Sequence, residues 1–371
     1  MHISRRGRLT CNPNEYHPLP GTAKRQKGVP AIGKPLVAVS PPTQTEEHPP
    51  TFAEQAAAWG GTVGLYDLPK PPHIYYFNPA LVEYMGRRWL IARRTFFDYD
   101  GTKAFNWADY RSTISVFEEQ NHNLVGEFDL PWPKRHHLEQ TEDPRASIIN
   151  GRLNLSLCCW KTPVPGQKWV VHQSLAELED WKVSRIIDME YGGNGRSLLE
   201  GRAYEKNWLW FEHNGHRYCV YHAQPMTVLR EEDGRVVEEH RIGADLGWDY
   251  GEIRGGTPPV RVGDEYWTFF HSSQPWKKIP PVGMRNRYFA GIVAFESRPP
   301  FRITRITRQP LLVGTYREPY IRFAPPCIFP SGALLKDNRW TVVYGVNDTT
   351  SGWLEVDHQN LEPLLTPVSY S

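Results

Sequence analysis

Five segments of the sequence share one plan, in which a short strand is followed by a turn of the type x-Gly or Asp-Asn and by an aromatic-rich strand that ends in polar residues. The segments are 80–94, 146–161, 209–224, 258–273 and 333–348. Their starts are roughly 50 to 75 residues apart, a period that suits one four-stranded propeller blade with loops of variable length. The repeat therefore predicts an all-β fold, a five-bladed β-propeller in which each segment forms the inner strands of one blade.

The second strand of each segment ends in a chemically useful side chain. These residues are Arg93, Lys161 after Trp160, Gln224, His271 and Asp348. In a propeller the ends of equivalent inner strands meet at one face of the central channel, so we expect these side chains to share a pocket. An irregular β-sandwich is the alternative fold, because hairpins resemble one another in any β-protein, but a sandwich gives no reason for such residues to meet.

The first part of the chain differs in composition from the rest. Residues 1–50 contain 9 of the 33 prolines and 7 Lys or Arg against 3 Asp or Glu, with almost no apolar periodicity, which is typical of an extended or loosely packed arm. We therefore expect an irregular, Pro-rich and basic N-terminal extension over residues 1–60 and one propeller domain over 61–371. Helical periodicity is present only from Phe52 to Trp59.

Charge and hydropathy exclude several classes of partner. The 371-residue chain has 43 Lys and Arg against 41 Asp and Glu, a balance that argues against a protein that binds nucleic acid or an anionic membrane. The sequence has no run of 18 apolar residues and no apolar leader segment, so we expect a cytoplasmic protein. The five cysteines are odd in number and mostly lie in apolar runs, so we expect them to be reduced and buried.

Six motifs, in order, resemble landmarks of glycoside hydrolase family 130 from roughly residue 75 to residue 350. They are NPALVEYMGRRWLIARR; EDPRASIINGRLNLSL; EKNWLWF with YHAQP; GGTPPVRVGDEYWTFFHSS; NRYFAGIVAFE with RQPLL; and CIFPSGALLKDNRWTVVYGVND. The resemblance implies a five-bladed propeller that phosphorolyses or hydrolyses β-mannosides, with an oligosaccharide or glycoside as its substrate. The related glycosyltransferase family 108 shares the fold and transfers mannose.

The resemblance also assigns catalytic roles. Asp143, in the motif Glu-Asp-Pro-Arg, corresponds to the family's proton donor, which protonates the departing glycosidic oxygen through a sugar hydroxyl. Glu142 and Arg145 would flank it, and Arg145 would lower the local cost of the carboxylate charge. The residues themselves add one expectation about the backbone, because Pro144 favours an extended conformation at Asp143.

Further site residues follow from the same resemblance. The positions that would hold the sugar in the −1 subsite are Asn78, Arg93 and Asp348, and those on the side of the attacking nucleophile are Lys206, Asn207, His271 and Tyr288. Three tryptophans, Trp160, Trp208 and Trp276, are candidate platforms for sugar rings.

Two arginines that phosphorylases of this family use to bind phosphate are missing. Their positions carry Tyr204, or Glu205, and Gln224, and the loss of two charge-assisted contacts of about 1.5–3 kcal/mol each disfavours phosphorolysis. We therefore expect hydrolysis by an inverting mechanism, which needs a carboxylate base about 6.5–9.5 Å from the acid. The candidates for that base are Glu205 and Glu252.

Several alternatives stay open on the sequence alone. A β-mannosyltransferase or a phosphorylase would share the fold, and a non-catalytic propeller would bind glycans through the same face. His136 and His137 do not suggest a metal site, because neighbours in an extended chain point in opposite directions and no third ligand follows at metal spacing. We expect no metal and no cofactor, and the sequence leaves open whether the chain forms a homo-oligomer.

Overall fold

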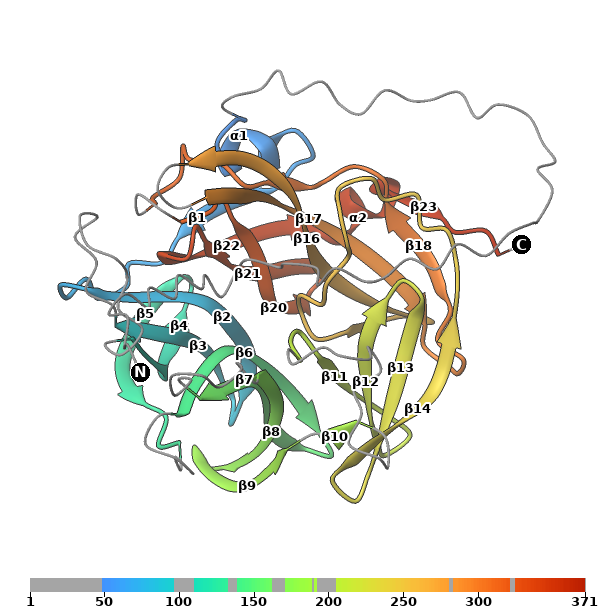
Figure 1. Ribbon diagram of the computed structural model, residues 1–371, viewed down its shortest axis with the longest axis horizontal. Coiled ribbons are helices and arrows are strands. Elements are labelled where there is room, and N and C mark those ends of the chain that lie inside the picture. Colours follow the sequence, from blue (N-terminus) through green and yellow to red (C-terminus); the bar gives the residue numbers. More distant parts are fainter. Residues whose placement is uncertain are drawn as a thin grey trace, which may run out of the picture.

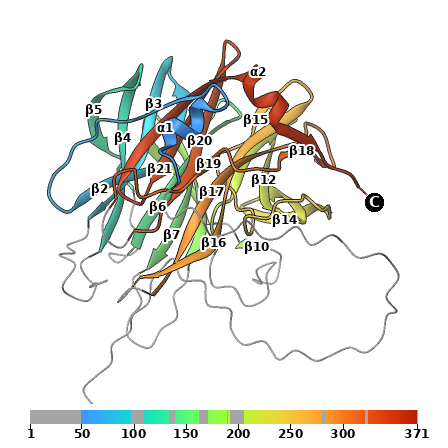
Figure 2. The same ribbon diagram turned by 90° about the horizontal axis from the view of Figure 1, so that it is seen from above.

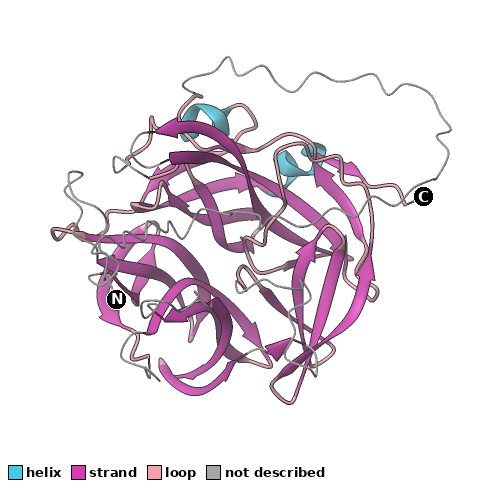
Figure 3. Ribbon diagram, in the orientation of Figure 1, coloured by secondary structure: helices cyan, strands magenta, loops and turns pink. Residues whose placement is uncertain are grey.

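The computed structural model describes residues 49–96, 110–132, 139–161, 171–188, 190–191, 205–279, 283–320 and 324–370. The described elements are almost all strands (Figure 3), and they form five sheets around a central axis (Figure 1). The chain is a five-bladed β-propeller, as the repeat predicts. Figure 2 shows the ring turned by 90°, with the long strands β16 and β17 running through its depth.

Each sheet forms one blade, whose strands follow one another from the axis outward. Blade 1 contains β2 (Ile74–Tyr84), β3 (Arg87–Phe96), β4 (Arg111–Gln120) and β5 (Asn123–Asp129). Blade 2 contains β6 (Glu139–Ile149), β7 (Arg152–Lys161), β8 (Val171–Glu179) and β9 (Lys182–Asp188). Blade 3 contains β11 (Leu209–His213), β12 (His216–Ala223), β13 (Met226–Glu232), β14 (Arg235–Ile242) and β10 (Glu190–Tyr191). Blade 4 contains β15 (Val260–Val262), β16 (Glu265–Ile279), β17 (Gly283–Glu296), β18 (Ile303–Thr307) and β23 (Leu365–Pro367), with β19 (Leu312–Val313) paired to β17. Blade 5 contains β20 (Ile328–Lys336), β21 (Arg339–Val346), β22 (Thr350–Asp357) and β1 (Thr62–Leu65).

Tight turns join the two inner strands of the blades. In four of them two successive residues have positive φ, and these pairs are Met85 with Gly86, Asn150 with Gly151, Asn214 with Gly215, and Asp337 with Asn338. Two left-handed residues in succession define the turn whose twist matches that of a β-hairpin, which explains the preference for Asn, Asp and Gly. The turn chemistry read from the sequence is therefore the chemistry that builds the blades.

Blade 5 is completed by a strand from the beginning of the described chain. Strand β1 pairs antiparallel with β22, with Thr62 opposite Glu355 and Leu65 opposite Gly352. Because β20, β21 and β22 come from the other end of the sequence, this pairing closes the ring.

Three short helical segments accompany the strands: α1 (Phe52–Ala57), α2 (His358–Leu361) and a 3₁₀ turn at Glu362–Leu364. Helix α1 lies in the stretch where the sequence shows helical periodicity, and Thr51 caps it through a reciprocal capping box. Its residues Phe52 and Ala56 are buried in the core cluster shared by blades 4 and 5. No helix in the described part of the chain has the length and apolar character needed to span a bilayer.

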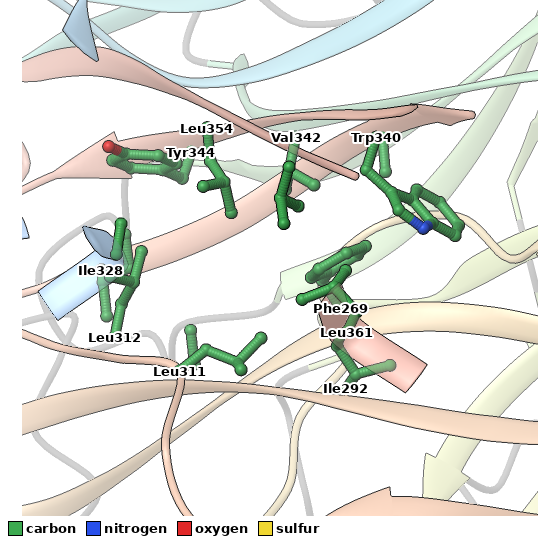
Figure 4. Close-up of a cluster of buried hydrophobic side chains, with 14 of the residues drawn as sticks. Phe269, Ile292, Leu311, Leu312, Ile328, Trp340, Val342, Tyr344, Leu354 and Leu361 are labelled. Carbon is green, nitrogen blue, oxygen red and sulfur yellow. The ribbon is translucent and has the colours of Figure 1, made fainter. Parts of the chain in front are cut away.

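Apolar side chains fill the spaces between neighbouring blades. The cluster between blades 4 and 5 (Figure 4) includes Trp267 and Phe269 from blade 4 and Trp340 and Tyr344 from blade 5. The rings of Trp267 and Trp340 stack with their centroids 5.8 Å apart. Burying a large apolar side chain stabilises a fold by roughly 1.5–3 kcal/mol, so the aromatic-rich strands supply the contacts that hold the blades together.

The cysteines within the described ranges are also part of the interior. Cys158, Cys159, Cys219 and Cys327 are buried and form no disulfide, in agreement with the expectation from the sequence. Cys11 lies outside the described residues.

Candidate active site

Asn78 and Asp143 meet because each lies at a bulge in the innermost strand of its blade. The pairing register shifts at both positions, and φ is 49° at Asn78 and 51° at Asp143, in the left-handed region. Asn and Asp tolerate this conformation better than most residues, and a bulge re-aims a side chain. As a result, Nδ2 of Asn78 donates a hydrogen bond of 2.8 Å to Oδ1 of Asp143.

The backbone of Asp143 differs from the sequence-based expectation. The residue before a proline is predicted to be extended, but Asp143 is left-handed. The steric rule mainly disfavours the right-handed helical region, and here the bulge decides between the remaining conformations. The bulge has a chemical consequence, because it lets the neighbouring side chains of Glu142 and Asp143 reach the same arginine.

Arg93, near the end of β3, bridges these two carboxylates. Its Nη1 lies 2.9 Å from Oδ1 of Asp143 and its Nη2 lies 2.7 Å from Oε1 of Glu142. The guanidinium also lies over the ring of Phe77, 4.6 Å from its centroid. Lys206 contributes a second cation, with Nζ 3.9 Å from Oε2 of Glu142. The site is therefore a compact cluster of opposite charges drawn from blades 1 and 2 and the segment that leads into blade 3.

Arg145 flanks Asp143, as the sequence suggests, and its charge helps to lower the pKa of that carboxyl group, but its hydrogen bonds go to other acceptors. It is 2% exposed, and its Nη1 donates to the carbonyl oxygen of Asp143 at 3.1 Å rather than to the carboxylate. Its Nη2 donates to Oδ1 of Asn207 at 2.8 Å, and its Nε donates to the carbonyl oxygen of Gly256 at 2.7 Å. Arg145 thus fixes the backbone that carries the proposed acid and positions Asn207 beside it.

Two buried polar atoms in this region have no hydrogen-bond partner among the described residues, Oδ1 of Asn78 and Nδ1 of His271. Unsatisfied buried polar atoms are rare in native proteins, and each of these two atoms can still form a hydrogen bond. The backbone also makes room for Asn78, because a Cβ on Gly345 of β21 would lie 1.8 Å from Oδ1 of Asn78. Glycine at 345 is therefore required for blade 5 to approach this side chain.

The charges set very different pKa values for the two aspartates of the site. Burial raises the pKa of Asp143, but Arg93, Lys206 and the hydrogen bond from Asn78 together lower it to about 2. Asp348 is partly buried in the turn between β21 and β22. Burial is the main cause that raises the pKa of Asp348 to about 6, and the nearby charges of Asp143 and Glu142 act in the same direction while Arg93 opposes it.

His271 and Tyr288 adjoin this cluster from blade 4. They lie near each other on β16 and β17, with ring centroids 6.1 Å apart. Burial, with the neighbouring cations Arg254 and Arg145, holds the pKa of His271 well below its usual value, and burial raises the pKa of Tyr288. Both rings are therefore neutral at physiological pH and contribute hydrogen-bonding groups, but no charge, to this region.

The two candidate bases have different surroundings. Glu205 accepts hydrogen bonds from Nε1 of Trp208 at 3.3 Å and from the hydroxyl of Tyr221 at 3.4 Å. Glu252 is more open, with 38% of its side chain exposed, and lies 3.2 Å from Nε2 of His222 and 3.3 Å from Nη2 of Arg254. The backbone of Arg254 pairs with that of His271, which places Glu252 on the His271 side of the cluster.

Some residues singled out from the sequence take no part in this cluster or lie outside the described ranges. Gln224 is exposed in the turn between β12 and β13, and its side chain donates to the carbonyl oxygen of Ala244. Trp160 and Trp208 are 3% and 1% exposed, so their rings are packed in the interior and are not sugar platforms, whereas Trp276 is half-buried. The side chain of Lys161, Tyr204, and the pair His136 and His137 are outside the described residues.

Tyr110 belongs to the site although no sequence pattern marks it. Its hydroxyl donates a hydrogen bond of 2.7 Å to Oε1 of Glu142 and accepts one from Nη2 of Arg93. Tyr110 lies just before β4, outside the five repeated segments. An isolated aromatic residue in such a place gives no signal in the sequence, because its partners are known only once the blades are assembled.

Comparisons with known proteins agree with the propeller fold. A family model described as beta-1,4-mannooligosaccharide phosphorylase, that of glycoside hydrolase family 130, matches residues 62–365. No curated protein matches the chain significantly. Similar solved structures include a beta-1,2-mannobiose phosphorylase from Listeria innocua, with 14% identity, a TM-score of 0.59 and coverage of 81% of this chain and 98% of that one. A glycosyl hydrolase from Bacteroides ovatus has 13% identity, a TM-score of 0.56 and coverage of 80% and 87%. A third structure has 12% identity, a TM-score of 0.55 and coverage of 77% of this chain and 85% of that one. It comes from work that describes, within this family of mannoside phosphorylases, glycoside hydrolases that target β-1,2 mannosidic linkages in Candida mannan.

Proposed function

The chain belongs to glycoside hydrolase family 130, a family of mannoside phosphorylases and hydrolases, and from this premise we propose that it hydrolyses a β-mannosidic bond with inversion of configuration. The observation that carries the proposal is the carboxylate of Asp143, held between Asn78 and Arg93 where blades 1 and 2 meet. An inverting glycosidase needs one such acid for the leaving oxygen and a separate base for water. Asn78, Arg93 and Asp348 would hold the sugar ring beside that acid.

Asp143 is ionised near neutral pH, because its pKa is about 2. A general acid must be protonated when the bond breaks, and it works best with a pKa near the working pH. A sugar that fills the site excludes water, and the loss of water disfavours the charged form of a carboxylate. Substrate binding therefore raises the pKa of Asp143 and prepares it to donate a proton, either directly or through a sugar hydroxyl.

The pairing of the nearby cations supports water rather than phosphate as the nucleophile. Arg93 contacts Glu142 and Asp143, Lys206 lies beside Glu142, and Arg254 pairs with Glu252. A phosphate dianion is bound best by guanidinium groups that can turn both donors toward it. Within the described ranges these cations already face carboxylates, so phosphate would have to displace an existing partner.

Glu252 suits the role of base better than Glu205. Its carboxylate is partly exposed beside His222 and Arg254, on the side of His271, where a water molecule has access to it. Glu205 also has two hydrogen-bond partners, Trp208 and Tyr221, but it is less exposed than Glu252. A base must accept a proton from water, so an accessible carboxylate is the stronger choice.

Product analysis tests the proposal directly. The full chain is incubated with β-1,2- and β-1,4-linked manno-oligosaccharides in water, with added phosphate and with added sugar acceptors, and the first product is followed by NMR. We expect free α-mannose at a rate independent of phosphate. Mannose 1-phosphate formed only with phosphate would identify a phosphorylase, product formed only with an acceptor would identify a transferase, and binding without turnover in every arm would identify a non-catalytic propeller.

Three variants test the residue roles in the same assay. Asp143→Asn is expected to lower kcat by about 100- to 10,000-fold, the usual contribution of a general acid. Asp129→Asn is the matched control, since Asp129 also pairs with an arginine of β3, Arg94, but is largely exposed on the outer strand of blade 1.

The base is tested by replacing each candidate carboxylate. Glu252→Gln is expected to lose hydrolysis and to recover turnover when azide replaces water as the nucleophile. Recovery by azide in Glu205→Gln instead would assign the base to Glu205.

A further inference from the structure

Tyr110 occupies a junction between blades 1 and 2. Its side chain is buried, and its ring packs against that of Trp160 on β7, with centroids 5.5 Å apart and planes inclined by 31°. The hydroxyl points at Glu142 and Arg93, which come from β6 and β3. The ring is thus fixed by packing, so the hydroxyl has a defined position in the charge cluster.

The contacts of Glu142 show what this hydroxyl does. Oε1 of Glu142 accepts from the Tyr110 hydroxyl at 2.7 Å and from Nη2 of Arg93 at 2.7 Å, while Oε2 lies 3.9 Å from Nζ of Lys206. The Tyr110 hydroxyl also accepts from Nη2 of Arg93. Glu142, Tyr110 and this one nitrogen therefore form a closed triangle.

The triangle determines what remains for Asp143. With Nη2 committed to Glu142 and Tyr110, the guanidinium presents Nη1 to Oδ1 of Asp143 at 2.9 Å. An arginine and a carboxylate otherwise prefer a two-pronged contact, in which both nitrogens face one carboxylate. Loss of the Tyr110 hydroxyl would let Arg93 turn into such a contact with Glu142 and away from Asp143.

We propose that Tyr110 is a positioning residue, which acts through Glu142 and Arg93 to hold Asp143 in the orientation needed for proton donation. The proposal rests on the proposed function, because it concerns the acid of that reaction. Tyr110 need not touch the substrate. Its effect belongs to the step in which the bond breaks, so it should change kcat more than KM.

The central variant is Tyr110→Phe, which keeps the ring against Trp160 and removes only the hydroxyl. Hydrogen bonds to charged groups typically contribute an amount that corresponds to roughly a 10- to 100-fold change in rate, so kcat should fall by about that factor while KM changes by less than about threefold. Tyr76→Phe is the matched control. The hydroxyl of Tyr76 donates to Oε1 of Glu127 at 2.9 Å in the same blade, but Glu127 is not part of the charge cluster.

A double-mutant cycle separates positioning from general stability. In the Asp143→Asn background the acid is already lost, so Tyr110→Phe should have little further effect on kcat, whereas a purely structural role would give additive losses. Glu142→Gln tests the network without touching the packed ring, and it should reproduce the loss in kcat because it removes the charge that anchors Nη2 of Arg93. Thermal melts of all variants accompany the kinetics.

Each outcome has a separate meaning. Full kcat in a folded Tyr110→Phe or Glu142→Gln protein, or strict additivity with Asp143→Asn, would overturn the positioning role and leave the proposed function intact. If Asp143→Asn itself kept full activity, the acid assignment would fail instead. If Tyr110→Phe did not fold, the result with Glu142→Gln would decide alone.

Discussion

At the scale of single residues, the site balances three cations against three carboxylates. The cations are Arg93, Arg145 and Lys206, and the carboxylates are Glu142, Asp143 and Asp348, brought together from blades 1, 2 and 5 and from the segment before blade 3. The two aspartates feel this balance differently. Arg93 contacts the carboxylate of Asp143 directly, whereas at Asp348 the effect of burial, which raises the pKa, is larger than the opposing effect of Arg93. Of the two aspartates, Asp348 is therefore the one that takes up a proton first as the pH falls.

This difference predicts a pH-dependent effect of Asp348 on stability. Because the folded protein raises the pKa of Asp348 from 3.8 to about 6, its ionisation opposes folding, and the cost is absent below about pH 4 and complete above about pH 6. Asp348→Asn should therefore raise the free energy of unfolding by up to about 3 kcal/mol at pH 7.5 and have little effect at pH 4. Denaturant titrations at the two pH values measure this difference.

A matched aspartate serves as the control for this prediction. Asp337 is exposed at the opposite end of blade 5, in the turn between β20 and β21. The substitution Asp337→Asn should therefore leave the free energy of unfolding unchanged at pH 4 and unchanged at pH 7.5. Equal effects of Asp348→Asn at pH 4 and pH 7.5 would show that the carboxyl group of Asp348 is not destabilised by burial.

The sequence predicts some of the residues that meet, but not how each of them is held. The motifs containing Asn78 and Asp143 are identified through the resemblance to the family, yet the left-handed backbone of both residues depends on bulges that only pairing with the next strand creates. Arg145 is predicted to flank Asp143, and its charge does help to lower the pKa of that carboxyl group, but no pattern predicts that its hydrogen bonds go to main-chain oxygens and to Asn207. Such choices depend on distances between blades, which no local pattern contains.

At the scale of elements, one arginine connects three blades. Arg145 extends from β6 of blade 2 to Asn207, which precedes blade 3, and to the carbonyl oxygens of Gly255 and Gly256 in the segment that leads into blade 4. The two glycines allow the close approach, since a Cβ at 255 would lie 2.1 Å from the carbonyl oxygen of Asn207, and one at 256 would lie 2.0 Å from that of Phe269. The two glycines of the Gly-Gly-Thr-Pro-Pro motif are therefore explained by close packing against neighbouring main chain, beside a buried guanidinium that binds their carbonyl oxygens.

This geometry predicts that lysine cannot replace Arg145. An ammonium group lacks the planar fork that serves several acceptors at once, so Arg145→Lys would leave buried carbonyl groups unsatisfied and should lower the free energy of unfolding by about 2–4 kcal/mol. The activity should also fall, because Arg145 holds the carbonyl oxygen of Asp143. Arg152→Lys on β7 is the control, since Arg152 is 61% exposed and lies 3.9 Å from Glu177; equal melting temperatures for the two variants would contradict the role of Arg145.

At the scale of the whole molecule, the site depends on a closed ring. The seam between blades 1 and 5 is joined by the hydroxyl of Ser331, which donates to the carbonyl oxygen of Pro79 at 2.7 Å, and by that of Ser351, which donates to the carbonyl oxygen of Tyr76 at 3.2 Å. Asn78 lies on one side of this seam and Asp348 on the other. The five repeats predict the ring, but outer strands such as β5, with only two of seven residues even partly buried, give no comparable pattern.

The last prediction concerns the closure itself. A chain that begins at residue 49 keeps α1 and β1, whereas one that begins at residue 67 lacks both, and with them the buried side chain of Phe52 and the pairing of β1 with β22. Loss of Phe52 alone removes burial of roughly 1.5–3 kcal/mol, and β22 becomes an unpaired edge. We expect the shorter chain to melt at a lower temperature, to aggregate more readily and to lose activity, because blades 1 and 5 can then separate and carry Asn78 away from Asp348. Calorimetry and the mannoside assay compare the two chains, and equal melting temperatures with equal activity would show that the ring does not need β1 to stay closed.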